Sequence, residues 1–219
     1  MNITSEIFQI GGEGFTSPSD AAAYLINFDG HAAIVDAGCG DRADRLIDNV
    51  LRHGVSPEQV AYLLITHCHF DHTGGIRAVT GYFSCPAVCH ELDAVYLESG
   101  DSAATAATWY GASLEPLSVD IKLSGPRQIL ALGERTIEAI HVPGHSPGSV
   151  VYLVESDGNR VLFGQDVHGP LHPDFHSNQR DYANSLQKML DLDADILCEG
   201  HYGIIKGKDE VTSFIQSFL

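Results

Sequence analysis

The chain has 219 residues, of which 44% are hydrophobic and 19% charged, a composition typical of a globular protein with a substantial core. Twelve Lys and Arg residues against 29 Asp and Glu residues give a formal net charge of −17, which disfavours nucleic-acid binding because phosphate contacts depend on Lys and Arg. The sequence contains no apolar run of about 18 residues and no basic N-terminal region followed by an apolar core, so we expect neither a membrane span nor a signal peptide.

The first half of the chain alternates short apolar runs with amphipathic stretches, which favours a layered α/β architecture. Residues 22–28 and 31–36 predict a β-hairpin, because the Asp-Gly pair between them suits its tight turn. One apolar face over residues 41–53 predicts a helix, and the apolar run 60–65 predicts a buried strand.

In the second half, residues 90–112 have a helical but broken pattern, which fits either a mobile insert over a site or two packed helices. Strands are predicted within 119–142 and 149–166, and helices over 181–192 and 209–219. Because no low-complexity linker separates these segments, we expect one domain over residues 1–219.

Directly after the apolar run 60–65 come three histidines and an aspartate within six positions: His67, His69, Asp71 and His72. Neutral imidazoles and carboxylates that converge in one place normally need a cation to hold them together. Three later apolar runs also lead to a metal-capable residue, namely His145, Asp166 and His201. Since sites in layered α/β proteins gather where strands end, we expect these seven side chains to build one pocket.

This compound pattern, together with Asp36-Ala37-Gly38 and the Pro-Gly-His-Ser-Pro-Gly-Ser segment 143–149, resembles the metallo-β-lactamase superfamily over nearly the whole chain. The resemblance implies an αββα sandwich of two mixed β-sheets flanked by helices. It also implies that His67, His69 and His145 hold one metal ion, that Asp71, His72 and His201 hold a second, and that Asp166 bridges the two. Two divalent metal ions are thus the expected cofactors, with zinc first and iron or manganese as alternatives, because the ligand types alone do not choose among them.

The function implied by the resemblance is that of a metal-dependent hydrolase, in which a metal-bound hydroxide attacks a small ester-like substrate, a thioester or a lactone first of all. Asp71 would also act catalytically by accepting or shuttling the proton. Asp36 is a candidate for fixing the tautomer of a ligand histidine, or else a turn or helix cap. His168 is a candidate substrate contact, or else part of a surface loop. Gln165 stands where the superfamily commonly has glycine, and its side chain either supports the site or faces solvent.

The alternative function is that of a persulfide-dioxygenase-like oxidoreductase, with one iron ion held by His67, His145 and Asp166. A phosphodiesterase or ribonuclease of the same superfamily is disfavoured by the negative net charge. The short segment that follows His201 leads us to expect no glutathione-binding helical domain there, so hydroxyacylglutathione is not the favoured substrate.

We expect a small-molecule substrate and neither a nucleic-acid nor a membrane partner; the oligomeric state stays open, with a homodimer as one option. Five cysteines without regular spacing predict no disulfide framework and favour a cytoplasmic location. Three of them stand beside predicted site loops, where oxidation would damage metal binding unless they are merely small buried residues: Cys39, Cys68 and Cys198. Tyr24, Trp109 and Tyr110 fit a substrate pocket and a packed core equally well, and we leave them outside the predicted site.

Overall fold

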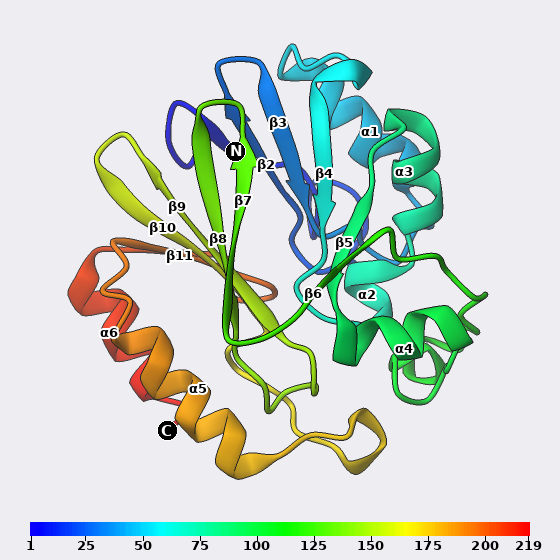
Figure 1. The fold of residues 1–219 in the computed structure, drawn as a ribbon, viewed down its shortest axis with the longest axis vertical. Coiled ribbons are helices and arrows are strands. Elements are labelled where there is room, and N and C mark those ends of the chain that lie inside the picture. Colours follow the sequence, from blue (N-terminus) through cyan, green and yellow to red (C-terminus); the bar gives the residue numbers. More distant parts are fainter.

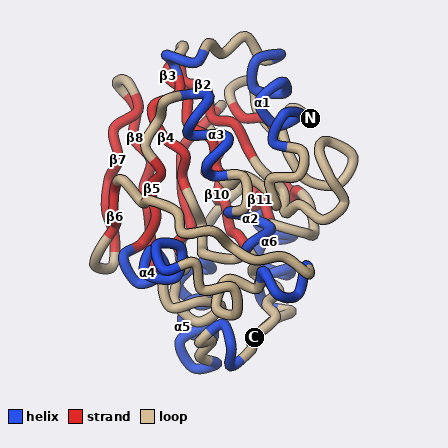
Figure 2. The backbone as a smooth tube through the Cα atoms, turned by 90° about the vertical axis from the view of Figure 1, so that its right-hand side faces the viewer, coloured by secondary structure: helices blue, strands red, loops and turns tan.

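Two six-stranded β-sheets pack face to face, and helices cover the outer face of each (Figure 1). The structure is a computed structural model that describes residues 1–219 apart from the side chain of Gln165, so the prediction made for that side chain lies outside the described part. Figure 2 looks onto one outer face, where helices and loops lie in front of the strands. The αββα sandwich predicted from the sequence is confirmed.

The first sheet is built from the N-terminal strands in chain order: β1 (Ile7–Gln9), β2 (Tyr24–Phe28), β3 (His31–Val35), β4 (Val60–Leu64), β5 (Ala87–His90) and β6 (Ile121–Leu123). The β1–β2 and β2–β3 pairs are antiparallel, whereas strands β3 to β6 are parallel to one another. The predicted hairpin is the β2–β3 pair, and it turns at Asp29 and Gly30 with φ angles of 51° and 84°. Such positive angles are those of the tight turn that Asp-Gly favours.

The second sheet holds the C-terminal strands: β7 (Arg127–Leu132), β8 (Arg135–His141), β9 (Val150–Ser156), β10 (Asn159–Gln165), β11 (Ile196–Glu199) and β12 (Ile204–Lys206). They lie in the order β12-β11-β10-β9-β8-β7. Only the β10–β11 pair is parallel among these described strands. Both sheets are therefore mixed.

Six α-helices and three short 3-10 helices connect the strands in the described chain: α1 (Ala43–Arg52), η1 (Pro57–Gln59), α2 (Phe70–Thr73), α3 (Ile76–Phe83), α4 (Glu91–Ser99), η2 (Ala107–Tyr110), η3 (Pro173–Phe175), α5 (Gln179–Leu190) and α6 (Lys208–Gln216). The helices predicted over 41–53, 181–192 and 209–219 correspond to α1, α5 and α6. Residues 90–112 form one α-helix and one short 3-10 helix instead of two packed helices. Gly100 ends α4 because its φ of +68° lies in the left-handed region that glycine adopts readily.

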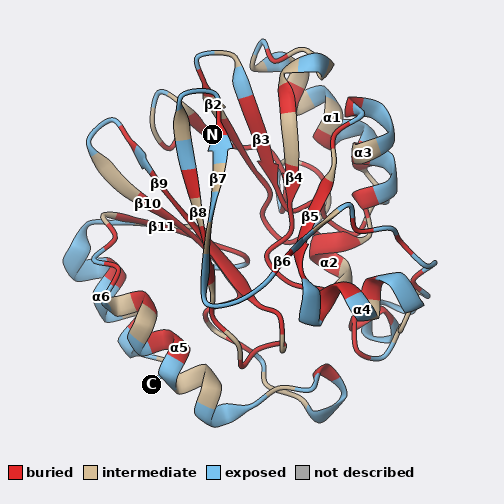
Figure 3. Ribbon diagram, in the orientation of Figure 1, coloured by how far each residue is buried: buried red, intermediate tan, exposed pale blue. Residues whose placement is uncertain are grey.

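Three apolar layers hold the sandwich together, one between the sheets and one under the helices on each side. Tyr152, Phe163 and Phe28 are among the largest buried side chains, and all three lie between the sheets. Figure 3 shows the strands mostly buried and the helices exposed on their outer sides. All five cysteines are free and buried. Among the described residues, no helix has the length and apolar character needed to cross a membrane.

Candidate metal centre

The predicted ligands lie on segments that follow the ends of four strands, one in the first sheet (β4) and three in the second (β8, β10 and β11). The segment after β4 carries the His67–His72 cluster into the short helix α2, where His69 is the N-cap residue. His145 lies between β8 and β9, Asp166 directly follows β10, and His201 follows β11. The first sheet thus supplies four of the seven side chains and the second sheet supplies the other three.

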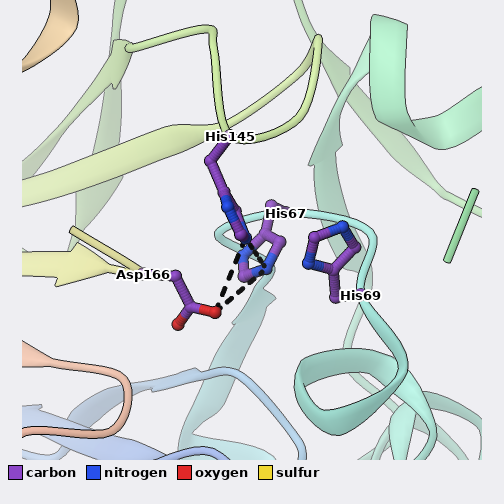
Figure 4. A group of neighbouring side chains, drawn as sticks. All are labelled: His67, His69, His145 and Asp166. Atoms are coloured by element: carbon purple, nitrogen blue, oxygen red, sulfur yellow. Dashed lines mark hydrogen bonds and ion pairs between the residues drawn. The ribbon is translucent and has the colours of Figure 1, made fainter. Parts of the chain in front are cut away.

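His67, His69, His145 and Asp166 form a first group whose ligand atoms all lie within 4.8 Å of one another (Figure 4). All four side chains are buried. The Nε2 atoms of His67 and His145 are 3.2 Å apart, and His145 Nε2 is 3.5 Å from Asp166 Oδ2. A tetrahedral zinc ion with ligands at about 2.0–2.1 Å would separate neighbouring ligand atoms by roughly 3.3 Å, so these spacings fit a shared cation.

Asp71, His72 and His201 form a second group beside the first. His201 Nε2 is 3.1 Å from Asp71 Oδ2 and 3.4 Å from Asp166 Oδ1. His72 Nε2 lies 3.2 Å from the same Asp166 oxygen. One carboxylate oxygen of Asp166 therefore faces the first group and the other faces the second, which is the placement that a bridging ligand requires.

Three polar atoms in these groups are buried and have no hydrogen-bond partner: His69 Nε2, His72 Nε2 and Asp166 Oδ1. A buried polar group without a hydrogen-bond partner destabilises the folded state by about 1–3 kcal/mol. Three such atoms at one place therefore indicate that a bound ligand satisfies them. Imidazole nitrogens and a carboxylate without thiolate are donors that suit zinc, iron or manganese. The residues present fit the divalent cations that the resemblance implies.

The two groups differ in the charge that their histidines carry. Burial, reinforced by neighbouring histidines, holds the pKa of His67 and of His69 well below the ordinary value of 6.5. Burial also opposes the charged form of His72 and His201, but nearby carboxylates outweigh it and raise both pKa values, that of His201 to about 10. His67 and His69 are thus neutral imidazoles, whereas His72 and His201 are protonated and their positive charge balances the carboxylates of the second group.

Asp36 connects two of the histidines to the first sheet. Its Oδ2 lies 2.7 Å from His72 Nδ1 and accepts a hydrogen bond from the Thr66 hydroxyl, while its Oδ1 accepts one from the Thr66 amide. The same hydroxyl is 3.1 Å from His67 Nδ1. This is the contact expected of a carboxylate that fixes the tautomer of a ligand histidine and leaves Nε2 free for a cation. His145 Nδ1 is held similarly, 2.9 Å from the carbonyl oxygen of Pro170.

Asp93, which the sequence analysis did not single out, joins the loops that carry the first group. Its buried carboxylate accepts hydrogen bonds from the Cys68 amide at 2.8 Å, the Ser146 hydroxyl at 2.6 Å and the Gly148 amide at 2.6 Å. A Cβ at residue 148 would lie only 2.5 Å from the Asp93 amide nitrogen, so glycine is required there. Asp93 lies in helix α4, and nothing local in its sequence marks these contacts to distant loops.

His168 is held beside the second group by Glu199. Its Nδ1 lies 2.8 Å from Glu199 Oε1. The other oxygen of the Glu199 carboxylate accepts hydrogen bonds from the backbone amides of His201 and Tyr202. Asp166, His168 and Glu199 lie close enough to hold a further cation. Because protein donors already occupy both Glu199 oxygens, its evident role is to position His168 and His201.

A cavity of 220 Å³ opens onto both groups. His168, Asp71 and His201 contribute to its wall. The aromatic residues of η2 and η3 add apolar surface: Trp109, Tyr110 and Phe175. Burial and the adjacent Asp71 carboxylate raise the pKa of Tyr110, so its hydroxyl remains protonated. Tyr24 belongs instead to the core, where its hydroxyl donates to the Glu199 carbonyl oxygen.

Comparison with known families gives one clear match. The family model described as the metallo-beta-lactamase superfamily matches residues 16–201. Among solved structures, a mutant metallo-beta-lactamase from Cronobacter sakazakii superimposes with a TM-score of 0.82 at 18% identity, covering 100% of this chain and 92% of that one. The class B3 di-zinc metallo-beta-lactamase LRA-12 from an Alaskan soil metagenome gives 0.77 at 25% identity, covering 92% of this chain and 77% of that one.

The names of similar curated proteins denote several different activities. A probable metallo-hydrolase of Methanocaldococcus jannaschii is 30% identical over 74% of this chain and 72% of its own length. A hydroxyacylglutathione hydrolase of Anaeromyxobacter dehalogenans is 36% identical over 68% of this chain, but that match spans only 46% of the relative. An acyl-coenzyme A thioesterase of Gallus gallus is 28% identical over 86% of this chain and 73% of its own length.

Proposed function

The chain belongs to the metallo-β-lactamase superfamily, and we propose that within it the protein is a hydrolase of small thioesters or lactones that works with two divalent metal ions. The observation that carries this proposal is the meeting of seven metal-capable side chains in two adjacent groups beside one cavity, with three of their buried polar atoms left without a hydrogen-bond partner. The completeness of the second group supports two ions, because a site for one ion would need only the first group.

Divalent cations bound here would polarise a substrate carbonyl and lower the pKa of water from 15.7 towards about 7. In the overall reaction water adds to the acyl carbon, the carbon–sulfur or carbon–oxygen bond breaks, and a carboxylate, a thiol or alcohol and a proton result. The reaction needs no oxidant, reductant or further co-reactant.

Asp71 is the chain's own candidate for handling the proton of the attacking water. Burial opposes its ionisation, but His72 and His201 lower the pKa below the ordinary value, so the carboxylate is charged at neutral pH. A charged carboxylate at the cavity wall can accept a hydrogen bond from water and so orient it. Tyr110, with its hydroxyl protonated, can donate a hydrogen bond on the same side of the cavity.

Thioesters come first because two relatives, the hydroxyacylglutathione hydrolase and the acyl-coenzyme A thioesterase, have names that denote thioester hydrolysis. The cavity volume of 220 Å³ favours a small acyl group, since pockets for drug-sized ligands measure about 300–1,000 Å³.

The test is metal analysis of protein purified without added metal, followed by assays with thioesters, lactones and phosphodiesters. We expect about two divalent ions per chain and hydrolysis of at least one thioester or lactone. His67→Ala should lose both the metal of the first group and at least about 100-fold in activity. His31→Ala is the matched control, because His31 is exposed at the start of β3, away from the ligand loops.

One iron ion per chain, with oxygen uptake on adding a thiol persulfide and no hydrolysis, would establish the dioxygenase-like alternative instead. Hydrolysis of phosphodiesters alone would establish the nuclease-like alternative. Either result would refute the proposed thioesterase or lactonase function.

A further inference from the structure

Building on the proposed hydrolase function, we propose that the substrate has a small apolar arm and a second arm that carries no negative charge. The first arm would lie against Trp109 and Phe175, and the second would lie beside Glu13 and Asp20. The charge of the second arm would therefore decide which esters the protein accepts.

The apolar part of the site is a row of mutually tilted rings that ends on a predicted ligand. Trp109 and Phe175 have their ring centroids 4.6 Å apart, and Phe175 lies 4.4 Å from the ring of His69. Phe175 is 2% exposed, whereas Trp109 is 54% exposed although it lines the cavity. A large aromatic side chain left half in water at a cavity mouth gains from covering by an apolar group.

His201 lines both this cavity and a second hollow of 290 Å³. The second hollow runs along the loop that contains Glu13, Pro18 and Asp20, and Tyr202 closes its other side. A substrate whose reacting carbonyl lies at the ligand groups can therefore extend one arm into each space.

Among the described residues that line the two hollows, none is Lys or Arg. The second hollow is instead lined by the acidic residues Glu13 and Asp20, of which Asp20 also accepts a hydrogen bond from the Cys39 amide, and the chain as a whole carries a net charge of −17. Like charges a few ångströms apart repel even in bulk water, and they repel more strongly beside a protein surface. Leaving groups with carboxylates or phosphates, such as glutathione or coenzyme A, would find no Lys or Arg partner in either hollow. Neutral and cationic leaving groups would meet no such penalty.

The experiment uses the metal-loaded protein and one acyl group, phenylacetyl, on three small thiols that differ in charge: N-acetylcysteamine (neutral), thiocholine (cationic) and mercaptoacetate (anionic). A parallel series uses lactones that bear a neutral, a cationic or a carboxylate side chain. We expect kcat/KM for the anionic member to be at least tenfold below that of the neutral one, and the cationic member to equal or exceed the neutral one. High salt should narrow the difference, because it screens exposed charges.

Glu13→Lys should lower the preference for cationic over anionic substrates about fivefold, because it inverts one charge of the hollow. Glu134→Lys makes the same change in the exposed turn before β8, at the opposite end of that strand from His145, and should leave the preference unchanged. Equal rates across the charge series, or equal effects of the two variants, would overturn this inference while leaving the hydrolase function intact. If no member of either series is hydrolysed, the proposed function itself has failed.

Discussion

Replacing Asp93 by asparagine would test whether one buried carboxylate holds the two main ligand loops together. The substitution keeps the shape of the side chain but removes one acceptor oxygen and introduces a donor. Oδ2 now accepts from the Cys68 amide and the Ser146 hydroxyl, and Oδ1 accepts from the Gly148 amide. Whichever way the new amide faces, one backbone N–H, either of Cys68 or of Gly148, loses its acceptor.

A buried N–H without an acceptor costs about 1–3 kcal/mol. Burial raises the pKa of Asp93 against the effect of its hydrogen bonds, so the neutral amide recovers part of that cost. We therefore expect the free energy of unfolding to fall by about 2 kcal/mol, which corresponds to a drop in melting temperature of roughly 4–8 °C for a chain of this size. Because Cys68 and Ser146 adjoin predicted ligands, metal affinity should also fall, by about 10–100-fold.

Urea unfolding and metal competition with a chromophoric chelator measure these two effects. Asp157→Asn is the matched control, because Asp157 also accepts a backbone amide and a hydroxyl, both from Ser5, but in an exposed position where water can replace them. Its unfolding free energy should change by less than about 0.5 kcal/mol. If Asp93→Asn matches that control in both stability and metal affinity, the linking role assigned to Asp93 is wrong.

Asp36→Asn should weaken metal binding about 10–100-fold, because the carboxylate that orients His72 is lost; the same chelator competition measures it, and unchanged affinity would contradict the assigned role. In the metal-free protein, burial opposes the charged form of His201, but the neighbouring carboxylates of Asp71 and Asp166 outweigh it and raise the pKa of His201 to about 10. This contribution to stability is fully present below about pH 6.5 and is lost as the pH rises through about 10, so urea midpoints of metal-free protein should fall from pH 7 to pH 10. Trp109→Ala should raise KM for an apolar acyl substrate about fivefold with little change in kcat, whereas Tyr82→Ala, another exposed aromatic, should not. Burial raises the pKa of all five thiols, so a thiol reagent should label them only after unfolding; rapid labelling of native protein would instead support the oxidation sensitivity predicted from the sequence.

Those parts of the site that follow a local pattern were predictable from the sequence. His67, His69, Asp71 and His72 form one short motif, and each later candidate follows an apolar run that became a strand. Strand ends gather at one edge of a layered fold. The position of each candidate directly after a predicted strand was therefore enough to predict that these residues lie together.

Contacts between distant segments were not predictable in this way. Asp93 is 55 residues from Gly148, and Glu199 is 31 residues from His168, yet each pair is hydrogen-bonded. No periodicity links such positions, because the contacts arise only when the two sheets and their loops pack. For the same reason the sequence could not show whether Trp109 lines the cavity or packs in the core, because the position of η2 depends on this packing.

The division of the seven donors between two sheets has a consequence for the order of folding. The first sheet and its loops come from the N-terminal part of the chain, and the second sheet comes from the C-terminal part. Each ligand group combines side chains from both parts, so neither part alone completes either group. A cation that requires ligands from both sheets can bind tightly only after the two sheets have packed together. Metal should therefore leave the folding rate nearly unchanged and slow unfolding instead, since it stabilises contacts that are absent from the transition state. The ions would then bind late in folding, so they would lengthen the lifetime of the native state without changing how quickly it forms.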